Sequence, residues 1–340
     1  METGGGGKAS MVPAERSVSP DSWIVVVNWN GAELLPRCLA ALERQTRSVQ
    51  VIVVDNGSSD ASAEVVARFA QVVWLPLGKN VGFAAATNAG FRRALAADAR
   101  WVGTVNTDVE LSESWLEALV SVGESRPHVG LLCGLLLFAD NPTRVNSTGL
   151  ALDCLYRARD RDFGTPLAEL ARPDGPVAGV TGGAALFRAE ALRRVGLFDP
   201  AYFAYCEDVD LSLRAASAGI GAWYVSTARA LHGYGRTFGS DSPWRRYLLA
   251  RNHMRVIASH LPLWSVLALT PALTFLRAWV KAPLELARGR PAHASAHLRA
   301  AGAGALAAIQ GLSRRLRGPD VIPPGAEPQE CEQASSVREH

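Results

Sequence analysis

The stretch Trp101-Val-Gly-Thr-Val-Asn-Thr-Asp-Val-Glu110 decides the fold. Its first five residues form a mostly apolar run without helical period, which is typical of a strand buried in a parallel sheet. The polar cluster Asn106-Thr107-Asp108 follows at once, and in open α/β sheets ligands bind beyond the carboxyl ends of such strands. Asp108 is suited to hold a divalent cation there. It is equally suited to start the turn into the helix expected over 112–122, so the stretch alone leaves both interpretations open.

Three strands are expected before this stretch, and each ends in polar residues. The apolar runs are Trp23–Val27, Val51–Val54 and Val72–Leu75. Each is followed by a loop and a segment with apolar residues at helical spacing, over 32–45, 61–70 and through Ala97. This alternation predicts an α/β fold with a doubly wound parallel sheet and polar residues collected at one edge.

The loops after these strands lack the common nucleotide-binding fingerprints. The first, Asn28-Trp-Asn-Gly31, is neither G-x-G-x-x-G nor a P-loop. Asp55 is an acceptor suited to the imide N–H of uracil or thymine, and Asn30 and Asn56 could meet ribose or base edges. Gly82 permits close backbone approach to phosphates. The run from Asp55 to Asp60 is also compatible with an ordinary turn.

Four stretches in this order carry a resemblance: VVVNWNG, VIVVDNGSSD, GKNVGFAAATNAG and VNTDVEL. They resemble the inverting glycosyltransferases of family 2, which have the GT-A fold, and in particular their bacterial rhamnosyltransferase-like and galactofuranosyltransferase-like branch. The similarity covers roughly Trp23 to Arg255, and several motifs in the right order are more specific than any one alone. The resemblance implies a nucleoside-diphosphate sugar as donor.

The same resemblance implies roles for the polar loops. Asp55 would read the base, and Asn106-Thr107-Asp108 would be a variant of the D-x-D motif that places a divalent metal, Mn²⁺ or Mg²⁺, on the diphosphate. Asn106 replaces the first acid of that motif, which leaves Asp108 as its carboxylate. The candidate donor-binding residues are Asn28, Asn30, Asp55, Asn56, Gly57, Asn80, Gly82, Phe83, Asn88, Asn106 and Thr107.

A second metal ligand is expected at His232. This histidine ends the apolar strand expected from Trp223 and is followed by a glycine. In the resembling family a histidine at this point can complete the metal site, and neutral imidazole suits Mn²⁺ better than Mg²⁺. A lone histidine is also commonly structural.

The acidic segment Glu207-Asp-Val-Asp210 opens a helix expected to reach Ala218. Acidic residues in a first turn stabilise the helix dipole, which is sufficient reason for them in many proteins. Glu207 and Asp208 are adjacent and cannot share one helix face. The resemblance implies that an aspartate here is the general base. We assign Asp208 to this role and Glu207 to acceptor binding, with Asp210 as the competing base.

The region between the D-x-D variant and this helix is expected to form further strands. They are predicted over 130–138, 144–152 and 179–187, with a charged irregular loop over 155–176. The last strand begins with Gly182 and Gly183, which the resemblance places at the border of the acceptor pocket. Glycines there also fit a strand bulge.

The carboxyl-terminal third is basic. Between Arg229 and Arg317 there are fourteen Lys and Arg residues against two acidic ones. This balance favours an anionic surface, and without a nucleic-acid-binding motif we expect membrane headgroups instead of nucleic acid. The uncharged run Val256–Leu276 is long enough to span a bilayer, but Pro262 and Pro271 should break it.

We therefore expect a helix pair lying on the membrane, with Trp264 and Trp279 at headgroup depth. A weakly apolar piece over 300–312 adds to it. The alternative is a helical cap on the catalytic domain's own core.

The predicted organisation has four parts: a disordered leader over 1–20, a GT-A domain over 21–255, a helical and possibly membrane-associated extension over 256–317, and a disordered tail over 318–340. No signal peptide is recognisable in the leader. Five scattered cysteines indicate reduced thiols, hence a cytoplasmic protein at the inner face of the membrane. They are Cys38, Cys133, Cys154, Cys206 and Cys331.

Together these observations predict an inverting glycosyltransferase. The sugar, rhamnose- or galactofuranose-like, would pass from a dTDP- or UDP-sugar to a hydroxyl of a lipid-linked or cell-surface glycan. A sugar-1-phosphate nucleotidyltransferase would need a glycine-rich basic loop after the first strand, which Asn28–Gly31 is not. A binding protein without catalysis would tolerate changes at Asp108 and Asp208, and both carboxylates are present. The sequence does not determine the sugar, the acceptor, the linkage or the oligomeric state.

Overall fold

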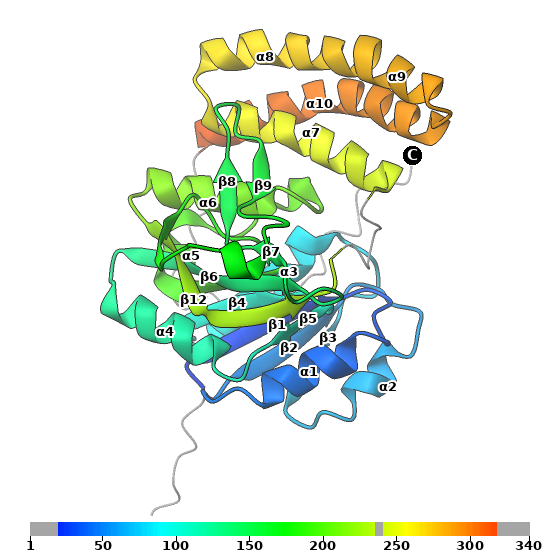
Figure 1. The fold of residues 1–340 in the computed structure, drawn as a ribbon. Helices are drawn as coiled ribbons and strands as arrows, with labels where there is room; N and C mark the ends of the chain where they lie inside the picture. Colours follow the sequence, from blue (N-terminus) through cyan, green and yellow to red (C-terminus); the bar gives the residue numbers. More distant parts are fainter. Residues whose placement is uncertain (1–19, 235–240, 318–340) are drawn as a thin grey trace, which may run out of the picture.

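The amino-terminal half forms the parallel part of a ten-stranded sheet (Figure 1). The computed structural model describes residues 20–234 and 241–317, so most of the expected leader and the whole expected tail lie outside the described residues. The strands run in the order β3-β2-β1-β4 and are all parallel, as the sequence predicts. They are β1 (Ser22–Asn28), β2 (Gln50–Asp55), β3 (Val72–Pro76) and β4 (Trp101–Val105).

Helices cover both faces of this sheet, which explains the uninterrupted apolar strands. Alternate residues of β1 enter different cores: Ile24 packs with the side of α1 and α4, and Val25 with the side of α3. The first two helices are shorter than predicted, the third ends one residue earlier, and the fourth, expected over 112–122, is shifted three residues toward the carboxyl end. They are α1 (Leu35–Glu43), α2 (Ser62–Val66), α3 (Phe83–Ala96) and α4 (Trp115–Ser125).

The second half adds antiparallel and parallel strands to the same sheet. Strand β11 (Ala184–Arg188) lies antiparallel between β4 and β6 (Val129–Phe138), and β12 (Gly221–His232) runs parallel to β6. The short β5 (Val109–Leu111) pairs with the end of β12 and aligns Val109 with His232. This pairing brings the D-x-D variant beside the predicted second ligand.

Three expectations for this half were wrong in detail. The strand predicted over 144–152 is divided into β7 (Val145–Ser147) and β8 (Leu150–Leu152) at Gly149, whose φ is +105°. The strand predicted from residue 179 begins only at Ala184, so Gly182 and Gly183 lie in the preceding loop. The segment 155–176 contains regular structure that long-range pairing creates. It includes β9 (Ala158–Asp160), a 3₁₀ turn (Leu167–Glu169) and the start of β10 (Gly175–Val177).

Two helices and a 3₁₀ turn follow β11 in this half. They are α5 (Ala189–Val195), the turn Pro200–Tyr202 and α6 (Glu207–Ser217). The described cysteines Cys38, Cys133, Cys154 and Cys206 are free. Cys331 lies outside the described residues.

A separate layer of helices lies over one end of the sheet body (Figure 1). Helix α7 passes residue 255 without a break, so the predicted domain boundary falls inside a helix. Pro262 separates α7 from α8, but Pro271 lies within α8, where it was expected to break the run. Gly304 and Gly311 let α10 approach α7 closely, because an added Cβ at Gly311 would lie 2.8 Å from the carbonyl oxygen of Arg255.

The helices of this layer are α7 (Pro243–His260), α8 (Leu263–Phe275), a π-helical turn (Leu276–Lys281), α9 (Ala282–Ala287) and α10 (Pro291–Arg317). The piece expected over 300–312 is part of α10.

Candidate active site

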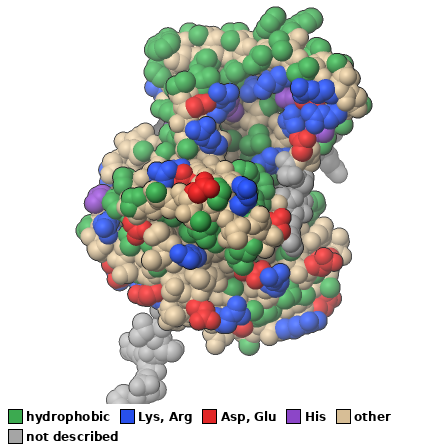
Figure 2. Space-filling view, viewed as in Figure 1, with side chains coloured by type: hydrophobic (Ala, Val, Ile, Leu, Met, Phe, Trp, Pro, Cys, Tyr) green, Lys and Arg blue, Asp and Glu red, His purple; other side chains and the backbone are tan. Residues whose placement is uncertain are grey.

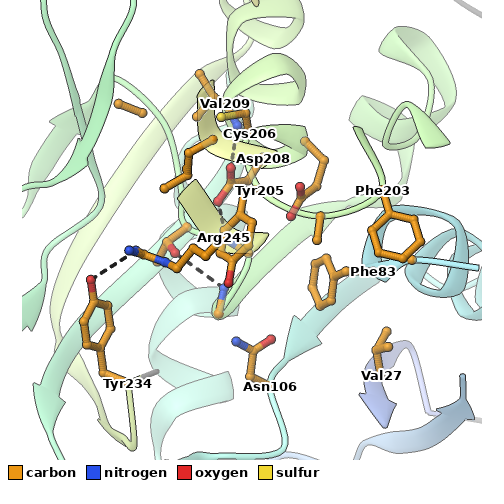
Figure 3. A pocket seen from close by; sticks show the side chains of 18 of the residues that line it. Val27, Phe83, Asn106, Phe203, Tyr205, Cys206, Asp208, Val209, Tyr234 and Arg245 are labelled. Carbon is orange, nitrogen blue, oxygen red and sulfur yellow. Dashed lines mark hydrogen bonds between the residues drawn. The ribbon is translucent and has the colours of Figure 1, made fainter. Parts of the chain in front are cut away.

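A cavity of about 600 Å³ lies where the polar loops after the strands meet the start of α6 (Figure 3). Most of the predicted site residues line it, although they come from loops up to 176 residues apart in the chain. Those that line it are Asn56, Asn80, Gly82, Phe83, Asn106, Thr107, Asp108, Gly182, Gly183, Glu207, Asp208 and His232. The topology therefore gathers the motifs that the sequence only places in order.

Four predicted donor residues do not line the cavity and instead hold the loops after β1 and β2. The buried Asp55 carboxylate accepts hydrogen bonds from Asn28 Nδ2 and from the Ser58 amide, each at 3.1 Å. Asn30 Oδ1 accepts from the Ser59 amide at 2.8 Å. Gly57 has a φ of +80°, and a Cβ there would lie 2.7 Å from the backbone of Lys79. Asn28, Asn30, Asp55 and Gly57 thus build the loop edge in this structure.

Asn88 is placed away from the cavity. It is buried on α3, where its Nδ2 donates to the Phe198 carbonyl at 2.7 Å and its Oδ1 accepts from the Phe198 amide at 3.1 Å. Both ends of the amide are therefore used to hold α3 against the segment before α6. The sequence showed an amide near a donor loop, but its position on the helix turns it into the core.

The donor loop and the acceptor side touch at Gly82. This glycine has a φ of +87°, and an added Cβ would lie 2.5 Å from the ring of Phe203. The Ala84 amide also donates to the Phe203 carbonyl at 3.1 Å. Only a residue without a side chain permits this approach, so Gly82 joins the two halves of the cavity wall.

Asp108 and His232 form a pair suited to a divalent cation. Asp108 Oδ1 lies 3.5 Å from His232 Nε2, and the other ring nitrogen lies 2.8 Å from Asn146 Oδ1. With Nδ1–H donating to Asn146, the Nε2 lone pair points toward Asp108, which is the arrangement that orients a metal-ligating imidazole. The described residues contain no group of three or more His, Cys, Asp or Glu able to hold a metal. Two protein ligands suit a cation that takes its remaining ligands from substrate phosphates and water.

Glu207 and Asp208 occupy the opposite side of the cavity at the start of α6. Asp208 Oδ2 accepts from the Gly182 amide at 2.8 Å. Burial raises the pKa of Asp208 to about 6, and the nearby Asp160 adds to the rise. Burial and the Asp208 charge raise the pKa of Glu207 well above its usual range, and Glu207 Oε2 has no hydrogen-bond partner among the described residues.

Asp160 is a site residue that the sequence did not reveal. It lies on β9 and lines the cavity. Burial raises its pKa, while a hydrogen bond from Ser147 and the charges of His232 and Arg245 oppose the rise. Because the segment around it was expected to be an irregular loop, nothing in the sequence pointed to a buried carboxylate.

Asp210 lies outside this cavity. Its carboxylate contacts Arg214 at 2.9 Å, Arg314 at 2.8 Å and His260 at 2.9 Å. These cations hold the pKa of Asp210 far below its usual range despite full burial. A carboxylate so neutralised is a weak base, and of the two candidates only Asp208 faces the cavity.

A side chain of helix α7 holds the loop that leads into α6 by hydrogen bonds. In this loop Phe203, Tyr205 and Cys206 all have left-handed backbone, with φ values of 65°, 69° and 69°. Asn252 Nδ2 lies 3.0, 2.8 and 2.7 Å from the carbonyl oxygens of Tyr202, Ala204 and Tyr205. Such backbone is costly and persists only where its surroundings hold it. Asn252, which the sequence did not single out, is thus a positioning residue for Glu207 and Asp208.

Two arginines also line the cavity. Arg245 on α7 lies 3.4 Å from the Tyr234 hydroxyl and 5.5 Å from the centre of the Tyr205 ring (Figure 3). Arg159 on β9 is exposed and forms no hydrogen bond or ion pair with any described residue. The cavity therefore combines two possible metal ligands, two arginines and a carboxylate with a raised pKa. Such a set is suited to transferring a group from a diphosphate to a hydroxyl.

Comparisons with known proteins agree with this arrangement. The model of the glycosyl transferase family 2 matches residues 23–196. The chain is 31% identical over 238 residues to the N-acetylglucosaminyl-diphospho-decaprenol L-rhamnosyltransferase of Mycobacterium tuberculosis, covering 64% of this chain and 78% of the relative. It is 25% identical over 250 residues to the galactofuranosyltransferase GlfT1 of the same organism, covering 69% and 81%.

A solved structure is similar over nearly the whole chain. The mannosyltransferase PcManGT from Pyrobaculum calidifontis, in complex with GDP-Man and Mn²⁺, has a TM-score of 0.52 and 18% identity, covering 89% of this chain and 90% of that one. This similarity supports the fold, and the match of the family model to just over half of the chain supports the family. The chain is a glycosyltransferase of the GT-A fold and belongs to the glycosyl transferase family 2.

Proposed function

We propose that the protein transfers a deoxyhexose or a furanose from a nucleoside diphosphate to a hydroxyl of a lipid-linked glycan, with inversion at the anomeric carbon. One observation carries the proposal: the cavity has Asp108 and His232 on one side and the half-buried Asp208 on the other. A donor whose diphosphate lies at the first side would present its anomeric carbon toward the second. A single displacement from that side inverts the configuration.

Asp208 would act as the general base. With a pKa of about 6 it is ionised at neutral pH and still basic enough to take a proton from a hydroxyl in the transition state. As the acceptor oxygen bonds to the anomeric carbon, the bond to the diphosphate oxygen breaks and its electron pair leaves with the diphosphate. The proton passes to Asp208. Burial and the charge of Asp208 raise the pKa of Glu207 well above its usual range, so its protonated form is favoured and would donate a hydrogen bond to the acceptor.

Asp108 and His232 would hold Mn²⁺ or Mg²⁺, and the bound cation would neutralise the departing diphosphate. Arg245 and Arg159 add positive charge on the cavity wall. Asn56 and Asn80, joined by a hydrogen bond of 3.0 Å, shape the loop beside the donor. Asn106 and Thr107 line the cavity next to Asp108 and complete the donor side.

The names of the relatives support rhamnose or galactofuranose as the sugar, and we expect it to be carried by dTDP or UDP. The test is thermal unfolding with dTDP- and UDP-sugars, with and without Mn²⁺, because a ligand that binds the folded state raises the unfolding temperature. We expect metal-dependent stabilisation by one of the two, lost in Asp108→Ala. Stabilisation without turnover of any acceptor would favour a sugar-binding protein that has lost catalysis. Absence of any nucleotide response would overturn the proposal.

We further propose that the helical layer rests on the inner face of the cytoplasmic membrane. One continuous stretch, Leu263–Ala287, has the length and composition of a membrane span. However, Arg277 and Glu285 are buried on its inner side, and it packs against α10. Lipid all round would leave those charges in hydrocarbon, so the helix suits the interface better. Its exposed apolar side chains include Leu263, Trp264, Leu267, Phe275, Trp279, Leu284 and Leu286 (Figure 2).

Vesicle co-sedimentation tests this placement. Replacing Trp264 and Trp279 by serine should weaken binding to vesicles containing phosphatidylglycerol and leave donor binding unchanged, because both side chains are exposed and far from the donor loops in the chain. Unchanged vesicle binding would favour the alternative, in which the helices only cap the catalytic domain. A nucleic-acid partner is not part of the proposal.

A further inference from the structure

The helical layer contains a buried cation without a counter-ion. The Arg277 residue is only 6% exposed, and its Nη1 makes no hydrogen bond with any described residue. Among residues 20–234 and 241–317 the side chain has no ion pair either. Burial lowers the pKa of Arg277 to about 10, with no carboxylate opposing the change. Burying a charge without a partner is strongly unfavourable, so such a residue needs a reason.

The groups around Arg277 are also basic. Lys281 lies one turn further on the same helix and is exposed, and partial desolvation and the charges of Arg277, Arg157 and Arg246 lower its pKa. His297 on α10 is 5% exposed with an unpartnered Nδ1. Burial and the charges of Lys281 and Arg246 lower the pKa of His297 to about 4. We call Arg277, Lys281 and His297 the inner basic cluster.

The neighbouring acidic residues already form ion pairs with other arginines. Glu285 pairs with Arg246 at 3.3 Å, with Arg288 at 3.5 Å and with Arg290 at 2.6 Å. Asp241 pairs with Arg246 and Arg290. Positive charge therefore exceeds negative charge in this part of the layer, and neither the buried Arg277 nor the exposed Lys281 forms an ion pair with a described acid.

Two elements connect the inner basic cluster with the catalytic cavity along the chain. On α7, Arg245 lines the cavity, while the charge of the next residue, Arg246, lowers the pKa of Lys281. At β9, Arg159 lines the cavity, while the charge of Arg157, just before the strand, lowers the pKa of Lys281. Figure 2 shows basic side chains along the underside of the helical layer, above a hollow that separates it from the sheet body.

The membrane side of the same turn is apolar. Phe275, Trp279 and Val280 are exposed there, so one turn of helix presents aromatic groups outward and Arg277 inward. This turn is π-helical, a less stable form that is frequent at functional sites. A ligand that is anionic at one point, apolar on one side and sugar-bearing on the other would match this arrangement.

We propose that Arg277 and Lys281 bind the phosphate or diphosphate that joins the acceptor glycan to its lipid, with His297 behind them. A planar guanidinium pairs well with phosphate oxygens, and the bound anion would supply the missing counter-charge. The lipid chain would leave along the apolar face, and the sugar would reach Asp208 through the hollow. This inference rests on the proposed function insofar as the acceptor is lipid-linked.

The first test needs no substrate. In Arg277→Met the buried charge is removed, so the unfolding temperature should stay the same or rise, as at functional sites that cost stability. The matched control is Arg255→Met, which removes an equally buried arginine that pairs with Asp199 at 2.7 Å and should lower the unfolding temperature. Equal destabilisation by both variants would make Arg277 structural and overturn the assignment.

The second test uses inorganic pyrophosphate without metal ions. It should raise the unfolding temperature of the wild type and fail to do so in the Arg277→Met, Lys281→Met double variant. Arg288→Met removes a neighbouring cation that is 54% exposed and paired with Glu285, and should keep the response. No response in the wild type, or an equal response in the double variant, would overturn the proposal. The response to donor sugar with Mn²⁺ should persist in the double variant, which separates this site from the proposed donor site.

The third test identifies the source of the phosphate. Neutral vesicles doped with a polyprenyl diphosphate are compared with vesicles given the same charge by phosphatidylglycerol. The wild type should bind the doped vesicles at least several-fold more tightly, and the excess should disappear in the double variant and remain in Arg288→Met. Equal binding to both vesicles, or an excess that the double variant retains, would overturn the assignment to the acceptor's phosphate.

Discussion

Asp208 and Asp210 lie two residues apart on α6, and the two sides of this helix have opposite electrostatics. On the cavity side, Asp208 has only backbone amides as partners, and burial raises its pKa to about 6. On the other side, two arginines and a histidine surround Asp210 and lower its pKa far below the usual range. Burial alone therefore does not identify a functional carboxylate. What distinguishes Asp208 is that no cation among the described residues pairs with it.

The same contrast applies to the arginines. Arg314 bridges Asp199 and Asp210 and so joins α10 to the catalytic body, whereas Arg277 pairs with no acid in the described part of the chain. Fully paired charges in this protein connect elements. Unpaired buried charges lie beside spaces that a substrate can enter. Variants of paired and of unpaired buried charges should therefore differ in whether they lose stability or activity.

Asp208→Asn should reduce kcat by about 10²–10⁴-fold, because an amide cannot accept the proton that a general base removes. Donor binding should be nearly unchanged, and stability at neutral pH should stay the same or rise, because the ionised Asp208 is unfavourable in the fold. The measurement combines turnover with donor titration on the same preparation. Full turnover in this variant would show that the unpaired carboxylate is not the base.

Asp210→Asn should have its main effect on folding. Removing one partner of a buried ion cluster leaves uncompensated charge and costs about 3–5 kcal/mol. Denaturant unfolding should show this loss, while kcat of the folded fraction changes little. A collapse of kcat with unchanged unfolding would break the comparison and make Asp210 the base.

Asn252→Ala should lower kcat by about 10–100-fold, because a displacement of about 1 Å in a catalytic group has effects of that size. The three carbonyls that Asn252 binds belong to the left-handed loop before Glu207, so its loss frees that loop. The donor KM should change little.

Asn88→Ala is the matched control for this prediction. Asn88 is also a buried amide that holds backbone, at Phe198, but outside the loop that enters α6. It should lose stability with a smaller loss of kcat. Equal losses of kcat in the two variants would remove the distinction between positioning the base and supporting the fold.

The sequence predicts the parallel half of the fold well because its signals are local. Four apolar runs without helical period, each followed by a helical segment, are sufficient for β1 to β4. The strands β8 and β9 could not be predicted, because they are three residues long and form only by pairing with each other. Asp160 therefore remained hidden in an apparently irregular loop.

The site is predicted less completely, because a sequence gives residue types and not their orientation. Asn88 and Asp55 have the right chemistry for a donor site, but the structure uses their hydrogen bonds inside the loops and the core. The choice between Asp208 and Asp210 depends on Arg314, which lies 104 residues after Asp210. No local pattern could show which carboxylate that arginine neutralises.

The pH dependence of activity and of stability should distinguish Asp208 from Asp210. As general base, Asp208 must be ionised, so kcat/KM should fall about tenfold per unit as the pH drops below about 6. For stability the two aspartates have opposite signs. The raised pKa of Asp208 favours its protonated form in the fold, so this contribution is present below the usual value of 3.8 and lost as the pH rises to about 6.

The lowered pKa of Asp210 favours its ionised form, so its contribution is present above 3.8 and lost as the pH falls below that value. Unfolding free energies measured from pH 3 to 7 should therefore change between about pH 4 and 6 in Asp208→Asn relative to the wild type. In Asp210→Asn the loss of stability should be largest above pH 4 and shrink in acid. If the unfolding free energies of the two variants changed with pH in parallel, the side chains around Asp210 would not make its pKa differ from that of Asp208.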